Sequence, residues 1–320
     1  YVVLSYRAEN KDSLYFSFRH ISSELALKLF AERYPDVFKD CTTWSEFFGC
    51  LQIYGKEKRP TVFFDDVGER NDKTDFYAAL KNFIDENSSC GVLVVLIGRP
   101  WEQIDIPCQT ISITPYSTQE IAETPSVSDK DSVDIFCLSA GITELLSLYD
   151  TSISFEENVK ALLHIDSPFY RLVKDKMCAC FRTPESYNTL LYAMVNGYNR
   201  ISELSAFSGY PKNKCDKYVK TLCEFGLVRK EPEKNGHTKY YPANSYIALW
   251  YKTLLTAVPN ADGSFGEDVY DHFMRYFNDE ILSAFYKEMC AYWLDRNINS
   301  ISTDYIDTKD LSYRNVKVGN

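Results

Sequence analysis

One apolar run dominates the hydrophobic pattern of this chain. It covers Thr61–Phe64, ends abruptly on Asp65 and Asp66, and is followed by Val67 and Gly68. It lacks the alternation of a half-exposed strand, and a continuously apolar strand is typical of the middle of a parallel sheet, where both faces are covered. The pattern therefore predicts a buried parallel strand that places two carboxylates at its carboxyl end.

Shorter runs predict the neighbours of this strand, and apolar residues at helical spacing predict helices between them. The expected strands are Leu14–Phe18, Gly91–Gly98 and a shorter one over Thr110–Ile113. The expected helices are one that ends at Asn10, one capped by Ser22 or Ser23, one that begins at Trp44 and one over Asp75–Glu86. Strands that alternate with helices form parallel sheets with right-handed crossovers, so we expect a three-layer α/β unit ending near Pro115 or Pro125.

The middle of the chain changes to a purely helical pattern. Residues 124–130 are polar, which predicts a domain boundary. Helical spacing then covers Asp131–Tyr149, Phe155–Leu163 and Phe169–Phe181, with no strand pattern. We expect this part to be a helical connector or lid.

Residues 184–246 predict three helices and a hairpin. The helices are expected over Pro184–Val195, Ile201–Phe207 and Pro211–Phe225. Leu227–Lys230 and Thr238–Tyr241 then flank a turn at Asn235 and Gly236, which is a hairpin signal. This order is typical of a winged helix-turn-helix.

The remainder is a Gly- and Asp-rich loop over 257–268, a strongly helical stretch over Val269–Arg296 and a polar end without a clear element.

Composition narrows the class of protein. The chain has 320 residues, 45% of them hydrophobic and 25% charged, and no apolar stretch approaches the roughly 20 residues of a membrane span. Its length suits two or three domains, and the lack of an initiator Met favours a fragment of a longer protein. Ten cysteines without C-x-x-C pairs and four scattered histidines argue against zinc and predict reduced thiols in the cytoplasm.

Charge is unevenly distributed. The net charge of −10 argues against attraction of nucleic acid to the whole surface. Residues 184–252, however, contain ten basic against six acidic residues, so a local basic face is expected there.

Asp65 and Asp66 are the first candidate site. Ligands of open α/β sheets bind beyond the carboxyl ends of the strands, where these acids would hold a phosphate-bound Mg²⁺. The plainer alternative is a core strand followed by an acidic turn at Gly68, and the eight residues are equally compatible with it.

Taken together, the sequence resembles the prokaryotic AAA-like ATPases close to the STAND group, which carry a winged helix and a degenerate nuclease-like tail. The resemblance covers most of the chain. It depends on Leu14–Ser17, the helix at Trp44, Thr61–Asp66 as a Walker B strand, Val92–Gly98 as the next strand, and two winged-domain segments, Glu185–Gly197 and Leu222–Val228. The resemblance implies ATP and Mg²⁺ as ligands, with Asp65 contacting Mg²⁺ through water and Asp66 polarising the attacking water. Arg99 directly follows the next strand, and from this position we expect it within reach of the γ-phosphate.

The resemblance also implies four parts. They are an ATPase core without its phosphate loop over 1–125, a helical lid over 126–183, a winged helix-turn-helix over 184–256 and a helical, degenerate nuclease-like tail over 257–320.

Three departures from the family pattern affect these expectations. No G-x-x-x-x-G-K-[ST] loop occurs in the 320 residues, so the motif lies upstream, or is omitted, or the protein is a pseudo-ATPase. Asp66 stands where the family has Glu, which predicts slow or absent hydrolysis, and Arg99 replaces a small polar residue and has an exposed structural role as its alternative. In the tail, Glu288 fits a nuclease pattern but Asn315 replaces its second acid, so we expect a tail that is non-catalytic or is truncated before its active half.

Two hypotheses follow. The first is an ATP-driven switch acting through the winged domain. The second is a module that binds duplex DNA, or docks on a protein partner or a second copy, with the ATPase fold as scaffold. The expected DNA contacts are Lys212, Lys214, Lys217, Lys220, Arg229, Lys230 and Lys239, and their alternative is a solvated lysine face.

Overall fold

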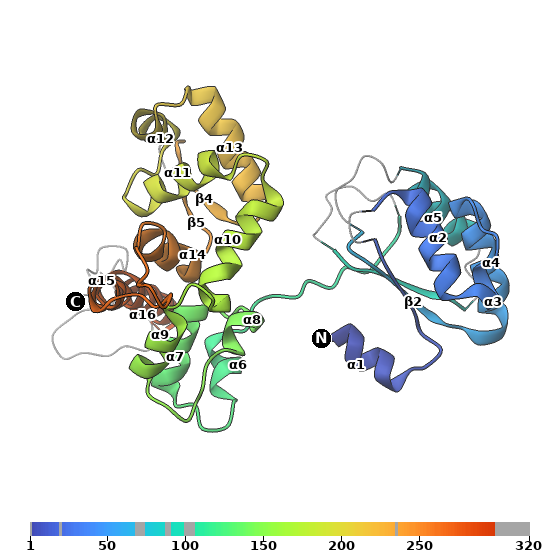
Figure 1. Cartoon of the computed structure of the whole chain (residues 1–320), viewed down its shortest axis with the longest axis horizontal. Helices are drawn as coiled ribbons and strands as arrows, with labels where there is room; N and C mark the ends of the chain where they lie inside the picture. The colour runs from blue at the N-terminus through green and yellow to red at the C-terminus, as the bar shows by residue number, and fades with distance from the viewer. Residues whose placement is uncertain are drawn as a thin grey trace. The chain divides into compact units, whose positions relative to one another are not determined.

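The computed structural model divides the chain into two compact units, Tyr1–Ile113 and Thr114–Asn320, and each is described by itself (Figure 1). The structure describes residues 2–18, 21–67, 74–86, 91–98, 106–233 and 236–297. Arg99, the turn residue Asn235 and the tail residue Asn315 lie outside these ranges.

The first unit is built on a three-stranded parallel sheet in the order β1-β2-β3. Its strands are β1 (Leu14–Ser17), β2 (Thr61–Asp65) and β3 (Leu93–Leu96). The Thr61 strand is therefore central, as its unbroken apolar pattern predicted, and Val62 and Phe64 are fully buried. This confirms a mixed α/β fold with a parallel sheet.

The described residues of this unit form five helices: α1 (Val2–Glu9), α2 (Ser23–Arg33), α3 (Pro35–Phe38), α4 (Trp44–Lys58) and α5 (Thr74–Glu86). Capping explains two of the starts. The Ser22 hydroxyl accepts a hydrogen bond from the Leu25 N–H at 3.3 Å, and Thr43 and Glu46 form a reciprocal capping box at α4. Hydrogen bonds from Thr42 lower the pKa of the Glu46 carboxyl, so this cap stays ionised.

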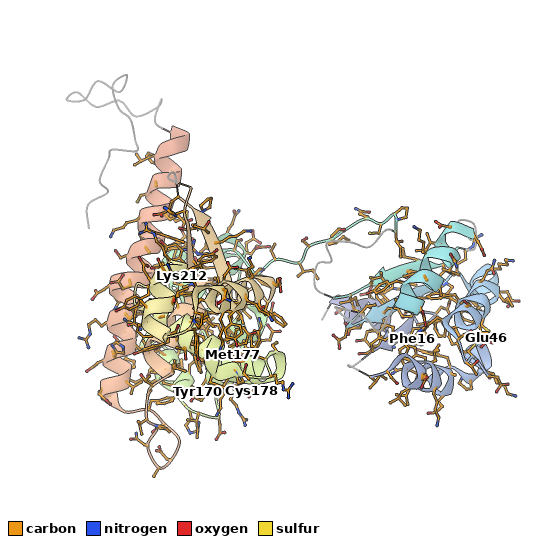
Figure 2. The ribbon with its side chains drawn as sticks, turned by 90° about the horizontal axis from the view of Figure 1, so that it is seen from above. Phe16, Glu46, Tyr170, Met177, Cys178 and Lys212 are labelled. Carbon is orange, nitrogen blue, oxygen red and sulfur yellow. The ribbon has the colours of Figure 1, made fainter. Side chains whose placement is uncertain are left out.

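Aromatic rings fill the core between sheet and helices (Figure 2). Phe16 of β1 lies within 4.7 to 5.6 Å of the rings of Phe30, Phe38, Phe47 and Phe64. Such ring pairs add to the free energy gained from burying apolar area. The core therefore joins β1 and β2 to α2, α3 and α4.

The predicted strand over Thr110–Ile113 is wrong. Residues 110–113 form no regular structure, and Ile111 and Ile113 are 81% and 85% exposed. Alternating Ile with Ser and Thr favours extended backbone, but a strand also needs a neighbour for its hydrogen bonds. This segment pairs with no described strand.

The second unit is mainly helical. Its elements are α6 (Thr118–Ala122), α7 (Asp129–Ser139), α8 (Thr143–Leu146), α9 (Phe155–Leu162), α10 (Pro168–Cys180), α11 (Pro184–Val195), α12 (Ile201–Ser208), α13 (Lys212–Glu224), β4 (Val228–Pro232), β5 (Thr238–Pro242), α14 (Ser245–Leu249), η2 (Trp250–Leu254), α15 (Glu267–Tyr276), η3 (Phe277–Leu282) and α16 (Ser283–Asn297). Strands β4 and β5 are antiparallel. Three helices followed by a hairpin thus occur where the sequence predicted them.

The predicted helix over Asp131–Tyr149 is wrong in its extent, because it is two helices, α7 and α8. Ala140 and Gly141 separate them in left-handed conformation, with φ of 53° and 70°. The Tyr116 N–H also donates to the Gly141 carbonyl at 2.9 Å. Through this hydrogen bond, the break after α7 holds Tyr116, near the start of the second unit, next to the end of that helix.

One hydrophobic core runs through the second unit. Tyr246 donates its hydroxyl to the Phe169 carbonyl at 2.6 Å, and the Trp250 indole donates to the Tyr170 carbonyl at 2.9 Å. Burial raises the pKa of the Tyr246 hydroxyl, which keeps it a donor. Segments that the sequence assigned to connector, winged domain and tail consequently share one core.

Among the described helices, none combines the length and apolar character that crossing a membrane requires.

Candidate functional site

Asp65 lies at the carboxyl end of the central strand and is held on both sides. Tyr15 of the neighbouring strand β1 donates its hydroxyl to Asp65 Oδ2, and Asp65 Oδ1 accepts the Asp66 N–H at 2.9 Å. The Asp65 carbonyl accepts the Phe18 N–H at 3.1 Å. The two hydrogen bonds fix the orientation of the carboxylate, and the residue as a whole is half-buried.

Helix α1 adds a cation to this arrangement. The Arg7 guanidinium lies 4.8 Å from the centre of the Tyr15 ring, and its buried Nε has no hydrogen-bond partner in the described part of the chain. Tyr6 anchors the helix, since its hydroxyl lies 2.9 Å from the Thr61 hydroxyl. Sequence reasoning missed the roles of both residues, because Arg7 belongs to no motif and Tyr15 was considered only as part of the strand Leu14–Ser17.

Asp66 turns the chain after β2. Its φ of 57° is left-handed, a conformation that aspartate adopts more readily than most residues. The next residue, Val67, is fixed by two hydrogen bonds. Its N–H donates to the Ile97 carbonyl at 3.3 Å, and its carbonyl accepts the Tyr77 hydroxyl at 2.5 Å. Burial raises the pKa of Tyr77 to about 12, so this donor keeps its proton. Asp66 and Val67, the described residues that follow β2, are therefore held in place.

The capacity of this edge for a metal is limited. Within the described ranges, no three His, Cys, Asp or Glu side chains gather closely enough to hold an ion. Arg99, expected near the γ-phosphate, lies outside them. An ion held by Asp65 would need most of its ligands from elsewhere.

The second candidate site is the exposed face of α13. Asn213, Lys217, Lys220 and Glu224 are all exposed and lie at helical spacing on one side, and Lys212 is exposed at the first turn. Lys220 forms an ion pair with Asp216 at 2.7 Å. The N-terminal half of this face thus keeps the cations of Lys212 and Lys217, for which no ion pair is described.

Lys214 is placed differently from the other lysines of α13. Its ammonium lies 4.2 Å from the Tyr210 ring centre and 5.3 Å from that of Tyr218. This cation–π arrangement directs it toward the body of the unit. Lys214 is therefore less available for an outside contact than the spacing suggested.

The hairpin cations are partly neutralised. Arg229 pairs with Glu231, and Lys239 pairs with Glu233 at 3.1 Å. Lys230 is exposed, and no ion pair is described for it. Of the seven predicted contacts, Lys212, Lys217 and Lys230 thus combine exposure with no described ion pair.

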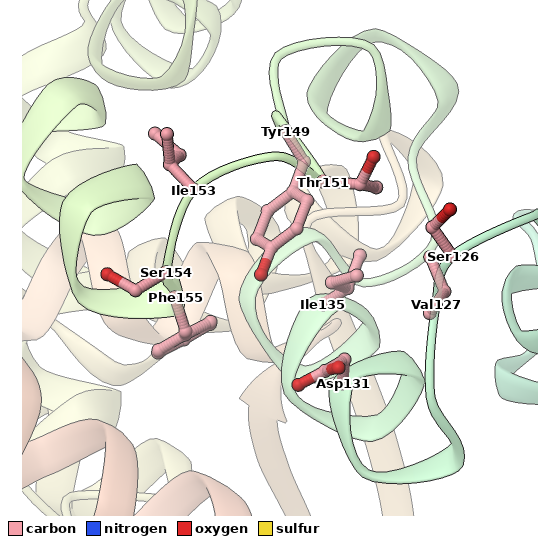
Figure 3. Close-up of a pocket in the computed structure, with 9 residues that line it drawn as sticks. All are labelled: Ser126, Val127, Asp131, Ile135, Tyr149, Thr151, Ile153, Ser154 and Phe155. Carbon is pink, nitrogen blue, oxygen red and sulfur yellow. The ribbon is translucent and has the colours of Figure 1, made fainter.

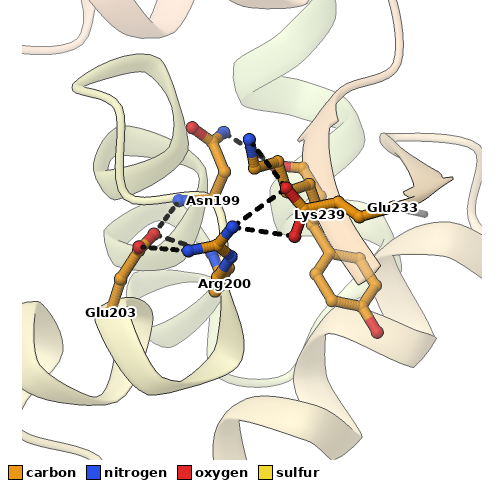
Figure 4. A network of polar contacts seen from close by, with 6 residues as sticks. Asn199, Arg200, Glu203, Glu233 and Lys239 are labelled. Carbon is orange, nitrogen blue, oxygen red and sulfur yellow. Dashed lines mark hydrogen bonds and ion pairs between the residues drawn. The ribbon is translucent and has the colours of Figure 1, made fainter. Parts of the chain in front are cut away.

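A polar network fixes the hairpin against the turn between α11 and α12 (Figure 4). Arg200 Nη2 donates to both Glu233 oxygens, at 2.9 and 2.8 Å. The Asn199 amide donates to the Tyr240 carbonyl at 2.8 Å, and the Tyr240 N–H donates to the Asn199 carbonyl at the same distance. Hydrogen bonds between charged groups are stronger than neutral ones, and this one nitrogen contacts both carboxylate oxygens. The sequence did not indicate this network, because its partners are 33 and 41 positions apart.

We expect the substitution Glu233→Gln to weaken folding in a pH-dependent way. Hydrogen bonds from Arg200, and then from Lys239, lower the pKa of the Glu233 carboxyl below its ordinary value of 4.5. A lowered folded-state pKa stabilises the protein above the ordinary value, and this contribution disappears as pH falls through the folded-state pKa. Denaturant unfolding at several pH values should therefore show wild type and variant converging below pH 4.5.

The matched control is Glu224→Gln on the exposed face of α13, where no ion pair is described. A stability difference between wild type and Glu233→Gln that stays constant from neutral to acidic pH would contradict the role of the pair.

A small cavity of about 160 Å³ lies between the starts of α7 and α9 (Figure 3). Two of its polar lining residues take part in helix capping: Asp131 accepts the Ser128 hydroxyl at 2.6 Å, and Ser154 caps α9. None of the predicted site residues lines it. We assign no ligand to this cavity.

No family model matches this chain, and neither does any curated protein. Its function is therefore inferred from the geometry of the two sites above.

Proposed function

We propose that the first unit binds Mg·ATP at the carboxyl edge of its parallel sheet and acts as an ATP-dependent switch for the second unit. The proposal depends on one observation: Asp65 ends the central strand and is oriented by Tyr15 of the adjacent strand. Ligands of open parallel sheets bind at this edge.

Magnesium suits this edge better than an ion that needs an all-protein cage. In nucleotide sites Mg²⁺ takes one or two carboxylates and completes its shell with phosphate oxygens and water. Each Asp65 oxygen accepts one described hydrogen bond, and a carboxylate oxygen has a second lone pair. The Arg7 guanidinium lies over the ring of Tyr15, the residue that also donates to Asp65. Its Nε has no hydrogen-bond partner among the described residues and is a donor that suits phosphate.

The two acids have different roles in this proposal. Asp65 would hold Mg²⁺ through water, and Asp66, directly after the strand, would orient the water that attacks the γ-phosphate. Bound Mg²⁺ supplies charge neutralisation at the phosphates. Because aspartate is one methylene shorter than the glutamate of similar ATPases, hydrolysis is slow. The 320 residues contain no glycine-rich phosphate loop, so tight binding needs backbone donors from outside this sequence.

The test is calorimetric titration of Mg·ATP into the natural protein, including any residues that it has before Tyr1. We expect Asp65→Asn to weaken binding about 10- to 100-fold, as loss of a group that orients a metal ligand does. Asp66→Asn should retain binding and lose any turnover. The control Asp75→Asn removes one exposed charge from the same unit and should change nothing. No heat of binding, or equal affinity of Asp65→Asn and wild type, would contradict the proposal.

A second function is favoured by the exposed cations of the second unit. We propose that α11, α12, α13 and the β4–β5 hairpin act as a winged helix-turn-helix that binds duplex DNA. Lys212 and Lys217 at the N-terminal half of α13 correspond to the part of a recognition helix that enters the major groove, and Lys230 lies on the hairpin. Because Lys220, Arg229 and Lys239 form ion pairs with acidic residues of the same unit, we expect their contribution to be small and the affinity for DNA to be modest. A protein partner is the alternative occupant of this face.

DNA affinity measured against salt concentration tests this second function. Removing one phosphate contact with Lys217→Gln should reduce the slope of log affinity against log salt by about 1. Lys174→Gln removes an exposed charge from α10 and should leave the slope unchanged. If wild-type affinity does not depend on salt, or both variants behave alike, the proposal that this face binds DNA is contradicted.

A further inference from the structure

Two cysteines of the first unit lie within reach of one another. Cys41, in the segment before α4, and Cys50, on α4, are nine positions apart, and their Sγ atoms are 3.6 Å apart. Cys41 is buried and Cys50 is half-buried. A disulfide has an S–S distance near 2.05 Å, so the sulfurs need to approach by about 1.5 Å to form one.

The backbone around this pair is fixed. Thr43 and Glu46 lock the start of α4 through the capping box, and the Cys41 N–H donates to the Phe38 carbonyl at 3.3 Å. Phe38 in turn stacks on Phe47 of α4, with ring centres 4.1 Å apart. The structure therefore holds the two thiols together through the packing on either side of them.

Proximity in sequence does not produce the same arrangement elsewhere. Cys178 and Cys180 are two positions apart on α10, where side chains at i and i+2 do not face each other. Cys178 is exposed, and no sulfur contact is described for it. This pair serves as an internal control.

We propose that Cys41 and Cys50 form a reversible disulfide by exchange with low-molecular-weight disulfides, which makes them a redox modification site of the first unit. The site is independent of nucleotide and DNA binding. When formed, the bond ties the segment before α4 to the second turn of that helix.

The order of the exchange follows from burial. Burial, and then the contact with Cys50, raises the pKa of the Cys41 thiol, so Cys41 is protonated at neutral pH. The more exposed Cys50 thiolate attacks the external disulfide, forms a mixed disulfide and releases one thiolate. Cys41 then loses its proton to solvent, attacks Cys50 Sγ and releases the second thiolate. The two cysteines lose two hydrogens in total, and the external disulfide is reduced to two thiols.

Mass spectrometry of the folded full chain can read this bond directly. No lysine or arginine lies between Lys39 and Lys56, so both cysteines fall on one tryptic peptide, Asp40–Lys56. After equilibration with glutathione disulfide we expect this peptide to be lighter by two hydrogen atoms and to take up no alkylating reagent until it is reduced. Peptides that retain both thiols, or that carry glutathione on Cys50, would overturn the proposal.

Two variants and a second readout separate the bond from general oxidation. Cys50→Ser should abolish the crosslink, and Cys178→Ser should leave it intact. Closing this short loop restricts the unfolded chain, so amide exchange in Asp40–Lys56 should slow about tenfold or more after oxidation and recover with reductant. Equal exchange in the oxidised and reduced chains would contradict the closure.

Discussion

Replacing Gly141 with alanine should destabilise the second unit by about 3 to 5 kcal/mol, from backbone strain and overpacking together. Gly141 has a φ of 70°, a conformation that costs side-chain-bearing residues free energy. An added Cβ would also lie 2.0 Å from the Tyr116 carbonyl oxygen, closer than any non-bonded contact allows. Backbone at both positions must move, and the hydrogen bond from Tyr116 to Gly141 is lost. Denaturant unfolding of the full chain measures the loss.

Gly226→Ala is the matched control for this prediction. Gly226 lies in the same unit and has a φ of 65°, but nothing lies within 4 Å of an added Cβ. It should cost only the conformational term, about 1 to 2 kcal/mol. The difference between the two variants isolates the contact with Tyr116. Equal losses would show that residue 116 does not pack on the turn between α7 and α8.

Phe64→Ala should destabilise the first unit by about 3 to 5 kcal/mol, the usual loss for a buried phenylalanine. Phe64 is fully buried in the central strand, and its ring lies 5.2 to 5.4 Å from those of Phe76 and Phe16. Truncation removes apolar area and leaves a cavity between sheet and helices. The neighbouring rings come from different elements, so they cannot all close in on it.

Ile53→Ala serves as the control, because Ile53 on α4 is 69% exposed. It should change stability by no more than about 0.5 kcal/mol. Both variants can be compared with wild type by denaturant unfolding, and an unchanged m-value shows that only stability differs. A loss below about 1 kcal/mol for Phe64→Ala would show that the aromatic cluster can rearrange, and that β2 is less rigid than the proposed Mg·ATP site requires.

The two proposed sites differ in how far sequence reasoning reached. Asp65 and Asp66 were found because a buried strand and its end are both visible in a short stretch of residues. Tyr15, which orients Asp65, is 50 positions away and belongs to another strand. Its role became evident only when β1 paired with β2.

The ion pairs of the winged helix-turn-helix proposed above likewise include a local pair that the sequence can indicate and a distant pair that it cannot. Lys220 and Asp216 form an i, i+4 pair, which helical spacing can indicate. Arg200 and Glu233 are 33 positions apart, and only the return of the hairpin to α12 brings them together. Counting charges therefore overestimated the cations available to a partner.

The sequence by itself determined the parallel central strand, the helix starts near Ser22 and at Trp44, and the order of three helices and a hairpin. These depend on local periodicity, capping and turn residues, which act over a few positions. Tertiary structure alone decided that Thr110–Ile113 has no strand partner, that Gly141 breaks a helix against Tyr116, and that Cys41 meets Cys50. Each of these depends on which distant segment packs alongside, and that is settled by the whole hydrophobic core rather than by any local pattern.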